Sequence, residues 1–303
     1  MKRRAFIAGL GGAVAWPVMA RAQENSRRLG FLCVGLPSDA FGKGIINAFL
    51  QGLSALGWHE GANLHIDWRW YAADAALAKR QAAELIALNP DVLLAGGNPA
   101  LETLSQQTQA IPIVFALVQD PLGMGYVENL AHPGRNVTGF ETYDPPIYTK
   151  ELQLFTEITP LITNVGAIYN PETAPYGSRM VRVMADASKP LAMNVRDVQC
   201  RSIAEVEAAM IMMAQENGGA LALGEVFTQL HRVEIADLAI KYRVPLVAAT
   251  RQVIESGGLM SYAIDLFDLF RRSAAYIDRV MKGEKPAELP VQAPTKFELL
   301  NQS

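Results

Sequence analysis

The chain has 303 residues, of which 50% are hydrophobic and 19% charged, with 27 basic and 30 acidic side chains. This composition is typical of a globular protein rather than a disordered one, and the length suffices for two lobes that each bury a core. The acidic balance argues against nucleic-acid binding, because that affinity depends mainly on Lys and Arg side chains that neutralise phosphates.

The first 22 residues have the order of a secretory signal. A basic head at Lys2–Arg4 precedes the uncharged apolar run Ala5–Ala20, and Ala20-Arg21-Ala22 presents small residues to a signal peptidase. The run is too short and too rich in glycine to span a bilayer, which requires about 20 apolar residues. We therefore expect a periplasmic protein that does not span the membrane. The two arginines also fit a twin-arginine signal, with a general secretory signal as the alternative.

Removal of residues 1–22 makes the chain more acidic. The segment holds four basic residues and no acid, so 23 basic and 30 acidic residues remain and the charge is −7. An exported acidic protein of this size is a poor candidate for a nucleic-acid partner.

Short apolar runs alternate with amphipathic segments from residue 29 onward. The first series predicts strands over 29–34, 64–71, 91–97, 113–118 and 136–141, and helices over 43–57, 76–88, 100–107 and from about Gly123. Strands separated by helices indicate parallel βαβ units with right-handed crossovers.

A second series of the same kind follows residue 142. It predicts strands over 164–170, 194–200, 219–224, 245–249 and 258–264, and helices over 148–158, 176–187, 204–217 and 227–242. A last helix carries Leu266, Phe270 and Ile277 on one face, and residues 282–297 then have the composition of a linker. The sequence thus predicts an α/β fold of two doubly wound parallel-sheet lobes around an interlobe cleft.

The candidate ligand-binding residues are those that directly follow strands, because ligands of open α/β sheets bind outside the carboxyl ends of the strands. They are small, polar or acidic, and several precede helices, whose free N–H groups favour anions. The predicted set is Ser38, Gly97, Asn98, Gln119, Asp120, Asn170, Glu225 and Asp265, with the aromatic residues Phe41, Tyr176, Phe227 and Tyr262 close by.

These residue types favour an amino acid or a similar small zwitterion as the ligand. Neutral donors suit a carboxylate, an acid suits an ammonium group, and aromatic rings suit an apolar side chain. In the alternative interpretation Glu225 and Asp265 cap the helices that follow them, and the aromatic residues belong to the core.

The sequence offers no set of catalytic or metal-ligating residues. It lacks the nucleophile elbow, the paired-cysteine, the zincin and the Walker patterns. His65 with Asp67 is a pair too small for a metal site. His231 and Glu234, three positions apart on a helix, could pair or bind metal, but an exposed helix face is the default interpretation. We expect no catalytic residue, no metal and no cofactor.

Several stretches resemble the ABC-transporter substrate-binding proteins that include tryptophan- and tyrosine-binding members. The most specific are NPDVLLAGG, QDPLG, HPGRNVTGF and LPVQAPTKFEL, and the resemblance covers nearly the whole mature chain. It implies a type I periplasmic-binding-protein fold with three crossover segments and a small-molecule ligand in the cleft. The partner it implies is an ABC permease with its ATPase, and we expect a monomer.

The two series of strands and helices set the expected domain boundaries. The junctions fall near Glu141–Asp144 and near Asp265. They predict an N-terminal lobe of residues 27–141 plus 265–286 and a C-terminal lobe of residues 142–264 plus 287–303. Two other functions stay open at this point: an exported sensory subunit with the same fold, and an exported enzyme on a doubly wound fold.

Overall fold

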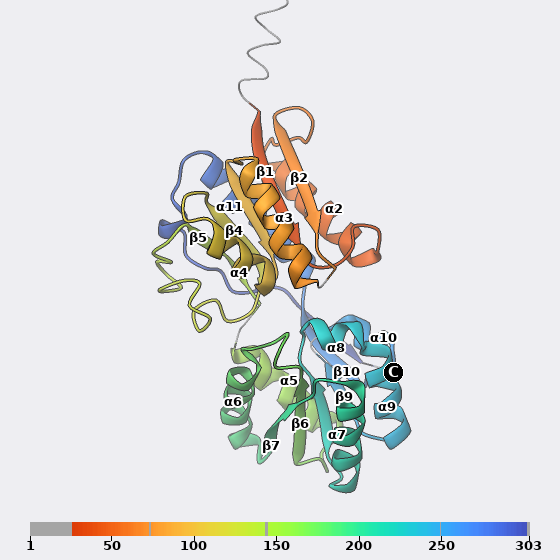
Figure 1. The fold of residues 1–303 in the computed structure, drawn as a ribbon. Coiled ribbons are helices and arrows are strands. Elements are labelled where there is room, and N and C mark those ends of the chain that lie inside the picture. The colour runs from red at the N-terminus through yellow and green to blue at the C-terminus, as the bar shows by residue number, and fades with distance from the viewer. Residues whose placement is uncertain (1–25, 73, 143–144, 249, 302–303) are drawn as a thin grey trace, which may run out of the picture. The chain divides into compact units, whose positions relative to one another are not determined.

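The chain forms two compact units in the computed structural model, which describes residues 26–72, 74–142, 145–248 and 250–301 (Figure 1). Unit 1 comprises Met1–Val118, Tyr126–Phe140 and Phe267–Val291, and unit 2 comprises Gln119–Gly125, Glu141–Leu266 and Gln292–Ser303. The predicted signal, residues 1–22, lies outside the described residues, and the domain boundaries expected from the sequence stay a prediction.

Unit 1 contains a five-stranded sheet in the order β2-β1-β3-β4-β5. The strands are β1 (Arg27–Cys33), β2 (Leu64–Trp70), β3 (Val92–Gly96), β4 (Ile113–Val118) and β5 (Val137–Glu141). Strand β1 pairs in parallel with β2 and β3, and β3 pairs in parallel with β4. The carboxyl ends of these four strands therefore meet at one edge of the sheet.

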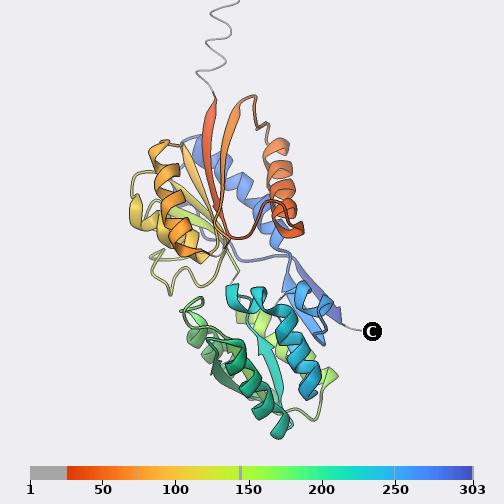
Figure 2. The same cartoon turned by 45° about the vertical axis from the view of Figure 1, so that its right-hand side comes forward.

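Helices cover both faces of this sheet (Figure 2). They are α2 (Ala40–Ala55), α3 (Ala75–Ala87), α4 (Asn98–Gln107) and α11 (Leu266–Met281). On one face the ring of Phe31 lies 5.8 Å from Phe49 of α2 and 6.3 Å from Phe270 of α11. Its neighbour Gly30 faces Leu85 of α3 on the other side. Consecutive strand residues point to opposite faces, so the alternation along β1 assigns α2 and α11 to one layer and α3 to the other.

Unit 2 contains a six-stranded sheet in the order β11-β10-β9-β8-β6-β7. The strands are β6 (Asn164–Tyr169), β7 (Asn194–Gln199), β8 (Gly219–Ala222), β9 (Leu246–Ala248), β10 (Met260–Ile264) and β11 (Phe297–Asn301). Neighbouring strands are parallel, except that β11 is antiparallel to β10.

Two helical layers also enclose the sheet of unit 2. Helices α5 (Pro145–Ile158) and α6 (Gly177–Ser188) cover one face, and α7 (Ile203–Gln215) and α9 (Arg232–Tyr242) cover the other. Ala167 of β6 belongs to the apolar cluster with Phe155 of α5, whereas the next residue, Ile168, belongs to the cluster with Met210 of α7. The shorter helices are α8 (Val226–Leu230), α10 (Arg251–Glu255), η1 (Lys189–Leu191) and, in unit 1, η2 (Pro286–Glu288).

The α/β fold with two parallel-dominated sheets confirms the sequence prediction, and three local predictions were wrong. Residues 121–125 form turns instead of a helix, because Asp120 and Gly125 have positive φ angles of 47° and 74°. The helix expected over 227–242 is divided at His231 into α8 and α9. The segment expected to be a linker contains η2 and runs into β11. Within the described ranges, no helix is long and apolar enough to cross a membrane.

Candidate functional site

The loop after β1 contributes Ser38, and the first turn of α2 contributes Phe41, at the carboxyl edge of the sheet in unit 1. Ser38 is exposed, and Phe41 is half-buried with its ring 6.2 Å from that of Phe267 on α11. Asp39 begins α2 by accepting a 2.6 Å hydrogen bond from the N–H of Gly42. The cap fixes the direction of α2, so Phe41 is held at this edge and does not enter the core.

Gly97 and Asn98 lie at the same edge, where β3 passes into α4. Gly97 has a φ of 103°, and a Cβ atom there would lie 3.2 Å from the hydroxyl oxygen of the buried Tyr71. Gly97 is the N-cap of α4 and supplies no side-chain hydrogen bond to the first turn. The N-terminus of α4, which begins at Asn98, therefore has no side-chain cap, and its dipole favours an anionic or carbonyl group.

Asn170 and Glu225 meet at the carboxyl edge of the sheet in unit 2. One oxygen of Glu225 accepts the N–H of Asn170 at 3.3 Å and that of Thr228 at 3.0 Å. The other accepts the N–H of Phe227 at 2.7 Å. Burial raises the pKa of Glu225, and these hydrogen bonds oppose the rise. Glu225 is the N-cap of α8, as the alternative interpretation expected, and its contact with a ligand stays a prediction.

Gln119 and Asp120 belong to the segment of unit 2 that follows β4. The side-chain amide of Gln119 donates a long hydrogen bond of 3.5 Å to the carbonyl oxygen of Gly224. Asp120 is buried, and its carboxylate accepts a 2.7 Å hydrogen bond from Arg179 in the first turn of α6. The sequence prediction included Asp120 but missed Arg179. The sequence signal for Arg179 was its position as a cation in the first turn of a helix that follows a strand. Its pairing with Asp120 has no local pattern, because the two residues lie 59 positions apart in the chain.

The remaining predicted residues divide between the core and the edge. Tyr176 and Phe227 are buried, at 4% and 8% exposure, in the two apolar clusters of unit 2. Tyr262 of β10 is half-buried, and its ring stacks on Phe297 at 5.8 Å. Asp265 follows β10, is half-buried, and donates its N–H to the carbonyl oxygen of Lys296 at 3.0 Å. Core packing therefore accounts for Tyr176 and Phe227, whereas Tyr262 lies in the middle of β10 and Asp265 directly follows that strand.

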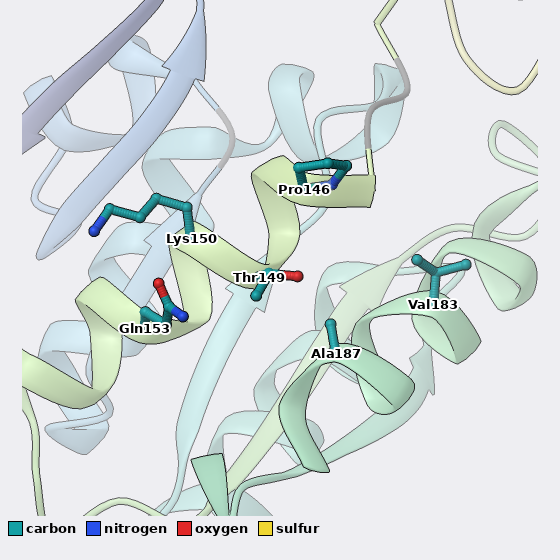
Figure 3. A pocket seen from close by; sticks show the side chains of 6 residues that line it. All are labelled: Pro146, Thr149, Lys150, Gln153, Val183 and Ala187. Carbon is teal, nitrogen blue, oxygen red and sulfur yellow. The ribbon is translucent and has the colours of Figure 1, made fainter. Parts of the chain in front are cut away.

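A separate open groove of about 420 Å³ runs between α5 and α6 of unit 2 (Figure 3). It is lined by Pro146, Thr149, Lys150, Gln153, Val183 and Ala187. None of the twelve residues predicted from the sequence lines it, and the α5 residues around it lie opposite the core-facing stripe of Tyr148, Leu152 and Phe155. Across the described part of the chain, no three His, Cys, Asp or Glu side chains converge as a metal site would require.

Residues 37–303 match the family described as ABC transporter substrate binding protein. The chain belongs to this family. The resemblance seen in the sequence is thereby confirmed, and the family is one of binding proteins rather than enzymes. A curated relative is a tyrosine-binding protein of Clostridioides difficile, 24% identical over 253 residues, which are 83% of this chain and 72% of the relative.

Solved structures of similar proteins agree with the fold. An ABC domain in complex with L-Trp from Streptococcus pneumoniae has a TM-score of 0.81 at 23% identity, over 91% of this chain and 92% of the other. A conserved domain protein from Vibrio cholerae has a TM-score of 0.80 at 26% identity, over the same shares. This substrate-binding protein therefore has the type I periplasmic-binding-protein fold expected from the sequence.

Proposed function

We propose that this substrate-binding protein binds an amino acid or a similar small zwitterion and presents it to an ABC permease with its ATPase for import. The observation that carries the proposal is the family match together with its relatives, one described as tyrosine-binding and one solved with L-Trp. Identities of 24% and 23% leave the ligand of this chain open to test.

The chemistry at the strand ends supports a zwitterionic ligand. In unit 1 the N-terminus of α4 carries no side-chain cap and its dipole favours an anion, and Phe41 offers an aromatic surface at the same edge. In unit 2 Asp265 places a carboxylate directly after β10. A carboxylate attracts an ammonium group, so Asp265 suits one of the two charged groups of an amino acid.

Export to the periplasm, possession of a removable signal and a monomeric state belong to the same proposal. The Ala20-Arg21-Ala22 sequence predicts cleavage after Ala22. N-terminal sequencing of the protein from a periplasmic fraction is expected to begin at Gln23; an intact Met1 in that fraction would contradict processing. Ligand-driven closing of the two lobes is the expected mechanism and remains a prediction from the sequence.

The test of the ligand class is a thermal-shift screen of residues 23–303 against the twenty L-amino acids, with D-glucose as an uncharged control. A ligand that binds only the folded state stabilises it by RT ln(1 + [L]/Kd), so the midpoint of unfolding rises with ligand concentration. We expect at least one amino acid, with aromatic ones foremost, to raise the midpoint and D-glucose to leave it unchanged. Stabilisation by the sugar with no response to any amino acid would refute the proposal.

A further inference from the structure

Arg179 projects from the first turn of α6 at the carboxyl edge of the sheet in unit 2. Helix α6 begins at Gly177, soon after β6 ends at Tyr169. The Nη1 atom of Arg179 donates a hydrogen bond of 2.7 Å to Oδ2 of Asp120. The Asp120 side chain is only 8% exposed, whereas that of Arg179 is 41% exposed. The carboxylate is thus buried beneath the guanidinium, which remains open to solvent.

The turn that follows Asp120 is shaped around this guanidinium. The Oδ1 atom of Asp120 accepts a 2.9 Å hydrogen bond from the N–H of Gly123, which fixes the carboxylate. A Cβ atom on Gly123 would lie 1.5 Å from Nη1 of Arg179 and within 2.6 Å of both Asp120 carboxylate oxygens. A side chain at this position would displace the guanidinium or the carboxylate, so Gly123 leaves room for their contact.

The contact with Asp120 uses only part of the hydrogen-bonding capacity of Arg179. A guanidinium carries five N–H donors in a planar fork, and the bond to Asp120 involves one of its nitrogen atoms. Within the described ranges, Nε and Nη2 of Arg179 make no hydrogen bond or ion pair. Asp120 orients the guanidinium through Nη1, and the N–H groups on Nε and Nη2 stay available. Two parallel N–H donors of this kind match the two oxygens of a carboxylate.

Two other arginines near this edge lack the fixed orientation of Arg179. Arg201 follows the outermost strand β7 and lies 3.6 Å from Glu172, with its side chain 54% exposed. Arg182, one turn further along α6, is exposed and makes no hydrogen bond or ion pair in the described part of the chain. Neither has a buried acid that fixes its orientation.

We propose that Arg179, oriented by the buried carboxylate of Asp120, binds the carboxylate of the ligand and selects for acids over their neutral amides. The inference rests on the proposed amino-acid ligand and names the residue that recognises one of its two charged groups. Asp120 is then a positioning residue, which accounts for its burial better than direct contact with a ligand does.

The experiment compares the affinity for an acid with that for its amide by isothermal titration. The probes are the amino acid that stabilises the wild-type protein most in the screen and the carboxamide of the same amino acid. The variants are Arg179→Met, Arg179→Lys and the matched control Arg182→Met. We expect the wild-type protein and Arg182→Met to prefer the acid, and Arg179→Met to lose roughly 10- to 100-fold in affinity for the acid with little change for the amide.

The ratio of the two affinities separates recognition from folding, because a loss of folded protein lowers the apparent number of sites for both probes alike. Arg179→Lys is expected to retain part of the preference, since it keeps the charge but not the fork. An unchanged acid-to-amide ratio in Arg179→Met would overturn this inference and leave the proposed ligand class intact. Failure of the wild-type protein to bind any amino acid would instead overturn the proposed function, and this inference with it.

Discussion

The hydroxyl of Thr173 donates a hydrogen bond of 2.5 Å to the carboxylate of Glu225, and this contact joins the loop after β6 to the loop after β8. The same carboxylate accepts backbone N–H groups from both loops. Two strand ends of unit 2 are thereby fixed relative to each other before any ligand binds. A ligand donor that contacts Glu225 would add to the hydrogen bonds that this carboxylate already accepts from the protein.

Replacement of Glu225 by alanine is expected to lower the free energy of unfolding by about 2 kcal/mol. The variant loses the cap of α8 and leaves buried donors without an acceptor. Chemical denaturation monitored by circular dichroism measures the change. Glu234→Ala is the matched control, because Glu234 is exposed and pairs with His231 at the surface; we expect a much smaller change there. Equal effects of the two substitutions would contradict the role assigned to Glu225.

Glu151 of α5 gives unit 2 an expected dependence on pH. Its side chain is 1% exposed, and neither carboxylate oxygen has a hydrogen-bond partner in the described part of the chain. Burial raises the pKa of Glu151 from 4.5 to about 8. Between these values the folded state keeps the proton that the unfolded state releases. Stability therefore falls as the pH rises through this window, by up to about 1.4 kcal/mol per pH unit.

Glu151→Gln tests this dependence because it replaces the carboxylic acid by a neutral group of similar shape. Denaturation curves at pH 5, 6.5 and 8 should show that the variant gains stability over the wild-type protein as the pH rises. Glu157→Gln, on the exposed face of the same helix, should follow the wild-type protein at each pH. If the difference between Glu151→Gln and the wild-type protein is the same at all three pH values, Glu151 does not titrate in this range.

The sequence predicted most of the fold because two patterns are clear along most of the chain: apolar residues at helical spacing, and short apolar runs typical of strands. Strands such as β3, VLLAG, are buried at every residue and read as compact apolar runs. Strand β11 was missed, since FELLN follows a proline-rich segment and pairs antiparallel with β10, a contact that no local pattern reveals. The helix wrongly expected from about Gly123 arose because apolar spacing gives no information on the positive φ of Gly125.

The candidate site was less predictable than the fold, because the roles of its side chains depend on partners distant in the chain. The positions after the strands followed from topology alone. Whether Asp120 contacts a ligand or another side chain depends on Arg179, and the partners of Glu225 include Asn170 and Thr173 on another loop. Aromatic residues gave the weakest signal: Phe227 and Tyr176 face apolar clusters, and their spacing is equally typical of a core.

A close contact between two helices predicts that Gly52→Ala destabilises unit 1. A Cβ atom at Gly52 of α2 would lie 2.4 Å from the carbonyl oxygen of Arg271 and 2.8 Å from Cβ of Ala274, both on α11. Backbone atoms cannot move aside without separating the helices, so we expect a loss of about 1–3 kcal/mol despite the higher helix propensity of alanine. Ser54→Ala, at an exposed position of the same helix, should leave stability within about 0.5 kcal/mol. A Gly52→Ala protein as stable as Ser54→Ala would show that α2 and α11 are packed less closely.

Asp265 is the residue expected to recognise the ammonium group of the ligand. It follows β10 directly, is half-buried, and is fixed by the hydrogen bond from its N–H to the carbonyl oxygen of Lys296. Asp265→Asn keeps the size and shape of the side chain but removes its charge.

If the Asp265 carboxylate contacts an ammonium group, Asp265→Asn should bind the best amino acid of the screen about 1.5–3 kcal/mol more weakly, the usual contribution of a hydrogen bond to a charged group. Isothermal titration measures the loss, and Asp237→Asn, an exposed acid on α9, is the control that should bind as the wild-type protein does. A folded Asp265→Asn protein with unchanged affinity would restrict Asp265 to capping the start of α11, and the ammonium partner would then have to be sought elsewhere.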